Sequence, residues 1–344
     1  MEPIIYALPK TEQLIEPSEL NIYFDNHPNP KLIKYGFNNI GNQLDLIALT
    51  SIPSYKAGLE FDFEQDGKDS LSGQANALFK TKKFDQTFGE FWEIFTLFGL
   101  LDTNQTIYSP KNSDTIKGVV DAYQKITNSK QNINISNNSK SNAGLVVYKY
   151  SDIDIDENAA TQFILDALPN LLSVQDLGSN MILQLFNLQT QITAEIIYLL
   201  NTLYVEAYVI KPSIVSDLFN TKYLVLINLK NKFKLVIPSH PNNVYLSSLG
   251  LKNLPNNFET VIQCVNSDVM PKKYKRYNLI KSYLDTKVYE GATYQEMIQA
   301  QIINAKKWLS TFDNISNLKT ILDSALEKTN SRCNTHAQLI NMFN

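Results

Sequence analysis

The stretch from Gly178 to Lys230, GSNMILQLFNLQTQITAEIIYLLNTLYVEAYVIKPSIVSDLFNTKYLVLINLK, decides the fold class. Met181 to Phe186 is an apolar run of strand length, and Ile192 to Leu203 places its apolar residues on one side of a helix. Tyr204 to Ile210 and Tyr223 to Leu229 are rich in β-branched and aromatic residues, which favour strands. A strand, an amphipathic helix and two further strands in this order predict an α/β protein.

Other predicted elements flank this stretch. The strongest helix is Gln86 to Asp102, whose aromatic residues recur at steps of three and four and are expected to lie in the core. Further helices with this apolar spacing are predicted at Asp114–Lys125, Asp156–Pro169, Thr293–Phe312 and Ile315–Leu326. Further strands are predicted at Leu44–Leu49, Gly144–Tyr150, Lys232–Pro238 and Val244–Leu249. The Asn- and Ser-rich segment Ile126–Asn142 is expected to be a loop.

The composition is that of a globular, intracellular protein. Of the 344 residues 44% are hydrophobic, and the net charge of −3 provides no general attraction for nucleic acid. The two cysteines, Cys264 and Cys333, do not make a disulfide framework and fit a reducing compartment. No apolar run reaches the roughly 18 residues of a membrane span, and the N-terminus lacks the pattern of a signal peptide.

Two partial metal motifs are incomplete. The run DFEQDG, from Asp62 to Gly67, places acidic residues at the first three ligand positions of a calcium loop, but Gly73 occupies the twelfth position. Cys333 and His336 have the spacing of half a zinc site, and no second pair of ligands accompanies them. We therefore expect no bound metal.

Two further catalytic or binding patterns are weak. The run GFNNIG, from Gly36 to Gly41, is followed by Asn42 and Gln43 where a phosphate-binding loop needs Lys and Ser or Thr. A triad built on histidine is poorly supported, because His27 and His240 precede prolines in turn-like segments and the third histidine lies close to the C-terminus.

The segment PKKYKRYNLIKSY, from Pro271 to Tyr283, mixes five cations with three tyrosines. Lysine and arginine bind phosphate and tyrosine stacks on bases, so the segment is a candidate for contact with RNA or a partner protein. A solvated or intramolecular surface is the alternative. The candidate residues are Lys272, Lys273, Tyr274, Lys275, Arg276, Tyr277 and Lys281.

The stretch quoted first also resembles the C-terminal half of FtsJ-like ribose 2′-O methyltransferases, especially those of large cytoplasmic DNA viruses. The similar segments are GSNMILQLF, VIKP at Val209–Pro212 and NTKY at Asn220–Tyr223. The resemblance implies a Rossmann-like fold in which a Lys-Asp-Lys-Glu tetrad acts on the ribose hydroxyl.

The chain departs from that family at the positions that carry chemistry. Gln184 stands at the place of a catalytic lysine, Thr221 at the place of the glutamate, and Ile214 to Asp217 lacks the expected arginine. No two glycines are closer than five residues, so the chain has no G-x-G loop for S-adenosylmethionine. The resemblance therefore implies a degenerate methyltransferase with no catalytic residues and no cofactor.

The N-terminal part is similar to the small subunit of poxvirus-type mRNA capping enzymes. The resemblance rests on Glu16–Gln43, EPSELNIYFDNHPNPKLIKYGFNNIGNQ, and on Phe91–Lys125, which follows the same order of helix, short strand, turn and helix. It implies a noncatalytic subunit that pairs with the methyltransferase domain of the large capping subunit and stimulates cap guanine methylation.

The sequence thus predicts an α/β fold with a mostly parallel sheet flanked by helices, in a degenerate FtsJ-like form. Residues 1–312 are expected to form one domain with an N-terminal arm at 1–35, and residues 313–344 a helical extension. The expected partner is the large capping subunit in a heterodimer, with RNA polymerase and nascent mRNA as possible further partners, in the cytoplasm, viral factory or virion. The alternatives are an active ribose 2′-O methyltransferase and an RNA-binding or polymerase-associated scaffold.

Overall fold

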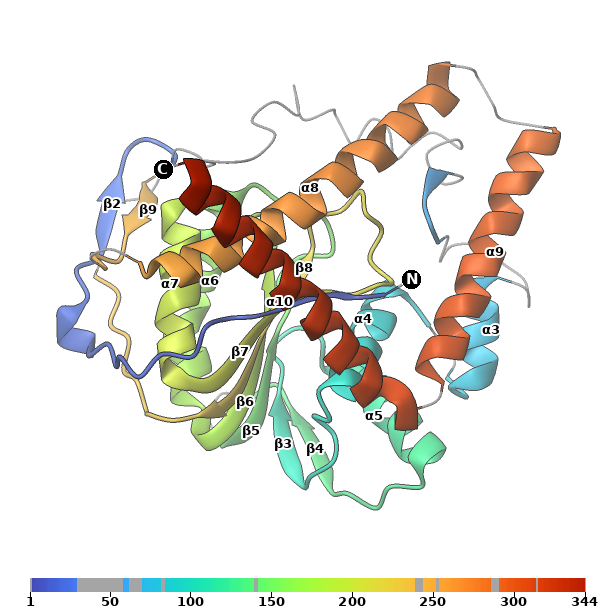
Figure 1. Cartoon of the computed structure of the whole chain (residues 1–344). Helices are drawn as coiled ribbons and strands as arrows, with labels where there is room; N and C mark the ends of the chain where they lie inside the picture. Colours follow the sequence, from blue (N-terminus) through green and yellow to red (C-terminus); the bar gives the residue numbers. More distant parts are fainter. Residues whose placement is uncertain are drawn as a thin grey trace.

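The computed structural model describes residues 2–29, 58–61, 70–81, 84–138, 142–238, 244–251, 254–285, 291–313 and 315–343. Its centre is a seven-stranded sheet (Figure 1). The strands of this sheet are β1 (Ile4–Ala7), β3 (Gln105–Tyr108), β4 (Ile133–Ser136), β5 (Ala143–Tyr148), β6 (Gln175–Leu185), β7 (Tyr204–Lys211) and β8 (Lys222–Leu229). A separate two-stranded ribbon consists of β2 (Tyr23–Asp25) and β9 (Tyr245–Ser248).

The strand order in the large sheet is β1-β7-β8-β6-β5-β3-β4. The neighbouring strands β4, β3, β5 and β6 run parallel to one another. Strand β8 pairs antiparallel with both β6 and β7, and β1 pairs antiparallel with β7. Five strands therefore share one direction, and the predicted mostly parallel sheet is confirmed at the level of a mixed, Rossmann-like α/β fold.

Helices cover both faces of this sheet. They are α3 (Leu71–Leu78), α4 (Gln86–Leu97), α5 (Ser113–Thr127), α6 (Glu157–Ser173), α7 (Gln191–Leu203), α8 (Asn256–Asp285), α9 (Ala292–Phe312) and α10 (Leu318–Phe343), with short 3-10 turns at Pro17–Glu19 and Ile315–Asn317. One core lies between the sheet and α6, α7 and the start of α8. A second core lies on the other face, against α3, α4, α5, α9 and the start of α10.

Strand β6 shows how the sequence builds this arrangement. Met181 and Leu183 belong to the core under α6 and α7, whereas Ile182 between them belongs to the core under α4 and α5. Successive side chains of a strand point to opposite faces, so a strand buried on both sides reads as a continuous apolar run. That is why the run Met181 to Phe186 was recognisable as a strand.

The aromatic helix predicted at Gln86 to Asp102 is α4, and its stripe is core. Asp85 caps the helix by accepting from the backbone N–H of Phe88 at 2.8 Å. Trp92 is fully buried, and its ring lies 4.5 Å from the ring of Phe79 and 6.5 Å from that of Phe88. Its indole N–H donates to the carbonyl of Phe312 at 3.0 Å, which ties α4 to the end of α9.

Several predicted boundaries were wrong. Helix α6 does not stop near Pro169 but continues to Ser173, because buried leucines on both sides of the proline keep the helix packed on the sheet. The predicted loop Ile126–Asn142 contains β4, which pairs with β3 through Ile133 and Ile135.

The two predicted edge strands also differ from expectation. Lys232–Pro238 forms no strand, and Val244–Leu249 contains β9, which pairs with β2 and not with the large sheet. The predicted strand Leu44–Leu49, the acidic run DFEQDG and the run GFNNIG all lie outside the described residues. The described part of the chain contains no helix long and apolar enough to cross a membrane.

Replacing Trp92 tests the central place of α4 in the core. We expect Trp92→Ala to lower the free energy of unfolding by about 3–5 kcal/mol, because it removes a fully buried ring and its hydrogen bond. Ile303→Ala on α9, where the side chain is 64% exposed, should change it by less than about 0.5 kcal/mol. Urea unfolding followed by circular dichroism measures both, and equal losses would contradict this packing.

Candidate functional site

The candidate site is the edge of the sheet where β3, β5, β6 and β7 end. In open α/β sheets, ligands bind outside the carboxyl ends of the strands, at the point where the strand order reverses. Here the chain passes from β3 to β4 on one side and then to β5 on the other side of β3. The reversal therefore lies between β3 and β5.

Side chains fill the position between β3 and β5. Tyr150 is buried and stacks on Phe163 of α6, with ring centroids 5.6 Å apart. The ammonium of Lys111, which follows β3, lies 5.7 Å from the centroid of Phe163 and donates to the carbonyl of Tyr150 at 3.4 Å. Tyr148 packs on Tyr150 at 5.5 Å. This aromatic cluster occupies the place where a Rossmann-like sheet would receive a ligand.

A buried ion pair lies beside this cluster. Nζ of Lys149 is 3.0 Å from a carboxylate oxygen of Glu90 on α4, and both side chains are almost fully buried. Burial alone would lower the pKa of Lys149, but the negative charges of Glu90 and Asp152 together raise it. The same Glu90 accepts from the hydroxyl of Tyr223 at 2.5 Å, so the pair also fixes β8.

Gln184, for which the sequence resemblance implies the place of a catalytic lysine, makes three hydrogen bonds within the fold. Its side-chain oxygen accepts from the backbone N–H of Tyr150 at 2.9 Å and of Ser151 at 3.1 Å. Its amide nitrogen donates to the carbonyl of Ser151 at 2.7 Å. The side chain is fully buried. Gln184 therefore clamps the chain leaving β5 onto the end of β6.

Two buried lysines lie at the same edge, and the sequence analysis did not identify them. Nζ of Lys222 donates to the carbonyls of Phe186 at 2.6 Å and Asn220 at 2.8 Å. Nζ of Lys211 donates to the carbonyls of Ser216 at 2.9 Å and Phe219 at 2.8 Å. A signal was present, because both lysines lie directly beside predicted strands, in the segments VIKP and NTKY.

Their environment changes the chemistry of both amines. Burial lowers the pKa of Lys222 to about 7, and the neighbouring charge of Lys211 acts in the same direction. Burial also lowers the pKa of Lys211 to about 8, against the opposing charges of Asp217 and Asp154. Thr221, for which the sequence resemblance implies the place of a glutamate, is buried beside Lys222.

Helix α8 lies across this edge (Figure 1). Its Asn266 donates to the carbonyl of Leu188 beyond β6 at 2.6 Å. Lys273 lies 3.7 Å from Asp154, whose carboxylate also accepts from the backbone N–H of Asn220. Arg276 lies 2.7 Å from Glu60. Contacts spaced along α8 thus cover the ends of β6 and β7.

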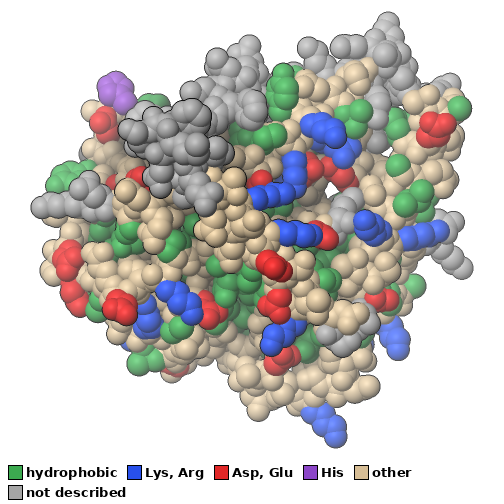
Figure 2. Space-filling view, in the orientation of Figure 1, with side chains coloured by type: hydrophobic (Ala, Val, Ile, Leu, Met, Phe, Trp, Pro, Cys, Tyr) green, Lys and Arg blue, Asp and Glu red, His purple; other side chains and the backbone are tan. Residues whose placement is uncertain are grey.

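The predicted basic segment Pro271–Tyr283 is therefore part of a long helix. Lys273 and Arg276 point toward acidic residues of the fold, and Tyr277 is half-buried. The exposed residues of the set are Lys272, Tyr274 and Lys275, and the side chain of Lys281 lies outside the described residues. On the face drawn in Figure 2, basic and acidic side chains lie interspersed and form no continuous basic surface.

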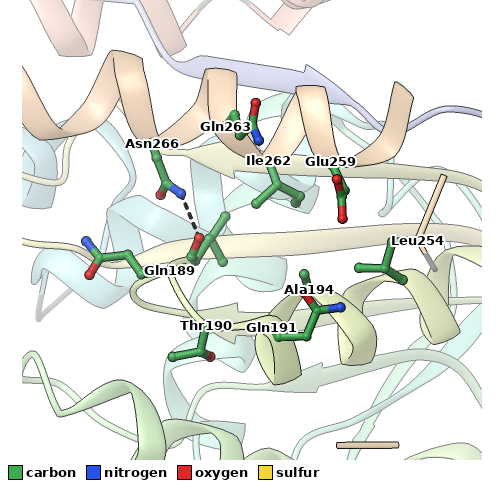
Figure 3. A pocket seen from close by; sticks show the side chains of 10 residues that line it. Gln189, Thr190, Gln191, Ala194, Leu254, Glu259, Ile262, Gln263 and Asn266 are labelled. Atoms are coloured by element: carbon green, nitrogen blue, oxygen red, sulfur yellow. Dashed lines mark hydrogen bonds between the residues drawn. The ribbon is translucent and has the colours of Figure 1, made fainter. Parts of the chain in front are cut away.

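Two cavities adjoin α8. One, of about 180 Å³, lies between α7 and α8, and amide side chains from both helices line it, among them Gln191 and Asn266 (Figure 3). The other, of about 320 Å³, is lined by three cations and three acids together with apolar and neutral residues. These charged residues are Lys211, Lys272, Arg276, Glu2, Glu60 and Asp217. Balanced charges of this kind do not select an anion or a cation.

The edge also holds buried polar atoms that have no hydrogen-bond partner among the described residues. They are Oδ1 of Asn112, Oη of Tyr150, Oε2 of Glu157 and Oδ1 of Asn220. Such atoms are uncommon in folded proteins and call for water or a ligand. The other oxygen of Glu157 accepts from the backbone N–H of Gln189 at 2.9 Å. The buried part of this edge is therefore polar.

No group of three or more metal-ligating residues occurs among the described residues. His27 is exposed in a turn whose backbone N–H bonds to Asp25, while His240 and the side chain of His336 lie outside the described residues. Cys333 lies near Cys264. The two cysteines belong to no group of three or more metal-ligating residues in the described part of the chain.

Fold and edge together define a Rossmann-like α/β protein whose own helix covers the carboxyl ends of its strands. No protein-family model matches the sequence. The chain is 45% identical over 349 residues to "Uncharacterized protein R383" of Acanthamoeba polyphaga mimivirus, and the match covers 100% of both chains. The chain belongs to the same family as that viral protein.

The buried amine of Lys222 should make stability depend on pH. Its pKa is about 7 in the folded state and 10.5 when exposed, so the unfolded chain binds more protons between these values. The contribution of Lys222 to the free energy of unfolding should therefore rise between pH 7 and 10.5 and be lost as pH falls through 7. Wild type minus Lys222→Met should grow by roughly 1–4 kcal/mol across this window.

Denaturant unfolding at several pH values measures this difference, and Lys275→Met on the exposed side of α8 controls for the loss of one lysine. Lys222→Met also leaves two carbonyls without their donor, which lowers stability at every pH and does not alter the slope. A difference that stays constant from pH 7 to 10 would contradict the assignment.

Proposed function

We propose that this chain is a noncatalytic regulatory subunit of a viral mRNA capping enzyme. It binds the methyltransferase domain of the large subunit and stimulates cap guanine methylation by stabilising the state that binds substrate. Such stimulation cannot exceed the difference in affinity of the chain for the two states of its partner. The resemblance to capping-enzyme small subunits and the relative from a large DNA virus support this proposal.

The observation that carries the noncatalytic assignment is the use of Gln184. All three of its hydrogen bonds are made to the backbone after β5, so the side chain has been committed to structure at the place of a catalytic lysine. A neutral amide neither carries the charge of that lysine nor acts as a base. The aromatic cluster between β3 and β5 and the helix over the edge support the same assignment.

A degenerate FtsJ-like methyltransferase fold is the finer proposal for the architecture. The parallel strands with an antiparallel β8 between β6 and β7 support it. The order of helices and strands over Gly178 to Lys230 matches the resemblance found in the sequence. A protein of this kind would contribute to capping through its outer surface, where exposed apolar residues such as Ile153, Leu177, Val236 and Ile303 are available.

Lys222 supports one second candidate, an active ribose methyltransferase with a rearranged site. Its pKa of about 7 suits a group that exchanges protons near neutrality. Against this, its amine is bonded to two carbonyls and buried, with α8 crossing the same edge. The RNA-binding alternative is weakened by the ion pairs of Lys273 and Arg276 within the fold.

The proposal predicts stimulation of the cognate large capping subunit. The chain should co-purify with that subunit and raise its rate of cap guanine methylation at least tenfold in an assay with capped RNA. Single replacements of Ile153, Leu177, Val236 and Ile303 by Asp should locate the contact, because those away from the interface act as matched controls. Absence of both binding and stimulation by the wild-type chain defeats the proposal.

The isolated chain is also expected to lack a methyltransferase site. Calorimetric titration with S-adenosylmethionine should give no saturable heat, and Gln184→Lys combined with Thr221→Glu should not create ribose methylation. The double variant should be less stable than wild type, because it breaks the clamp on Tyr150 and Ser151. Saturable cofactor binding by the wild-type chain would favour the enzyme candidate instead.

A further inference from the structure

The two cysteines of the chain lie together although 68 residues separate them in the sequence. Cys264 belongs to α8 and Cys333 to α10, and both pack on the same hydrophobic core. Both thiols are free, and their side chains lie close enough for each to change the pKa of the other. Figure 1 shows α10 crossing α8 near its C-terminal end. Since the chain has only these two cysteines, only one intramolecular disulfide is possible.

The surrounding contacts place the cysteines over the N-terminal strand. Arg332, next to Cys333, forms an ion pair with Asp268, one helical turn after Cys264. The hydroxyl of Tyr6 in β1 donates to Asp268 at 2.5 Å and lies 3.4 Å from the carbonyl oxygen of Cys264. Strand β1 is therefore held by α8, through Tyr6, at the point where α10 meets that helix.

A second contact fixes β1 to α10. The hydroxyl of Thr329, one turn before Cys333, donates to the carbonyl of Ile5 at 2.7 Å. Because β1 has only four residues and pairs with β7 alone, its position depends on these two helices. A covalent link between the helices would close a ring around it.

We propose that Cys264 and Cys333 form a reversible disulfide that fastens α10 to α8 over strand β1. The cysteine pair is a redox-sensitive site separate from the carboxyl edge of the sheet, and it does not depend on the proposed role in capping. In the reduced state the helices are held by packing and by the Arg332–Asp268 ion pair. In the oxidised state a disulfide bond also joins the two helices.

A small-molecule disulfide such as oxidised glutathione supplies the oxidising equivalents. The thiolate of Cys333 attacks one sulfur of the glutathione disulfide, which forms a mixed disulfide and releases one glutathione thiolate. The thiolate of Cys264 then attacks the Cys333 sulfur, which forms the internal disulfide and releases the second glutathione. The protein loses two electrons and two protons, and one glutathione disulfide becomes two thiols.

The environment favours Cys333 as the attacking residue. Cys333 is half-buried, whereas Cys264 is only 4% exposed. The side-chain interaction with Cys264 lowers the pKa of Cys333, and the same interaction together with burial raises the pKa of Cys264. The thiolate is the nucleophile in disulfide exchange, so the more accessible and more acidic thiol reacts first.

The test equilibrates the full chain with mixtures of reduced and oxidised glutathione, quenches it with acid and measures intact mass and thermal unfolding. Oxidation should remove the mass of two hydrogen atoms, link the peptides that contain Cys264 and Cys333, and raise Tm by several degrees. Backbone amides of β1 should exchange with deuterium more slowly in the oxidised form. Cys264→Ser and Cys333→Ser are the matched controls and should show none of these changes.

Peptide mapping of the wild-type chain decides the question even where a serine variant fails to fold. A stable glutathione adduct on Cys333 without internal linkage would overturn the proposal, as would a covalent dimer through Cys333. The proposal would also be overturned if the intact mass of the chain stayed unchanged in a glutathione mixture that oxidises a reference dithiol such as dithiothreitol. An internal disulfide with an unchanged or lowered Tm would contradict the proposal that the bond fastens α10 to α8.

Discussion

The carboxamide of Gln184 fixes the backbone at Tyr150 and Ser151, and the geometry of the carboxyl edge depends on that attachment. It sets where the chain turns from β5 toward α6, and hence where Tyr150 stacks on Phe163. An amide can donate and accept at once, which a lysine cannot do. The side chain of Gln184 therefore serves the structure of this edge by bonding to the backbone in both senses.

Helix α8 depends on the surface that this clamp creates. Asp154 follows the clamped segment directly and receives Lys273, while Glu60 receives Arg276. Both ion pairs are partly buried, so water competes less with their contacts. They orient the helix across the ends of β6 and β7. The buried lysines below it are held by loop carbonyls and not by counter-ions. Packing and hydrogen bonding therefore close an edge that remains polar in composition.

The sequence predicts those parts whose signal is local. The period of apolar residues identifies β6, α7, β7 and β8, and aromatic spacing identifies α4, because burial on one or two faces imposes these periods. Helix α8 was missed because its charged segment meets the fold through residues far away in the chain, Asp154 and Glu60. Strand β1, the buried state of Lys222 and the pairing of Cys264 with Cys333 likewise depend on tertiary contacts that no local pattern encodes.

The helix over the carboxyl edge limits access of a substrate to the buried groups there. A reacting group must touch its substrate, and the amine of Lys222 is bonded to two carbonyls beneath a helix that two ion pairs hold in place. Catalysis there would require α8 to move and Lys222 to exchange its carbonyl partners at the same time. Binding of a partner through the outer surface requires neither change. The second route leaves the buried network intact, which agrees with the proposed regulatory role.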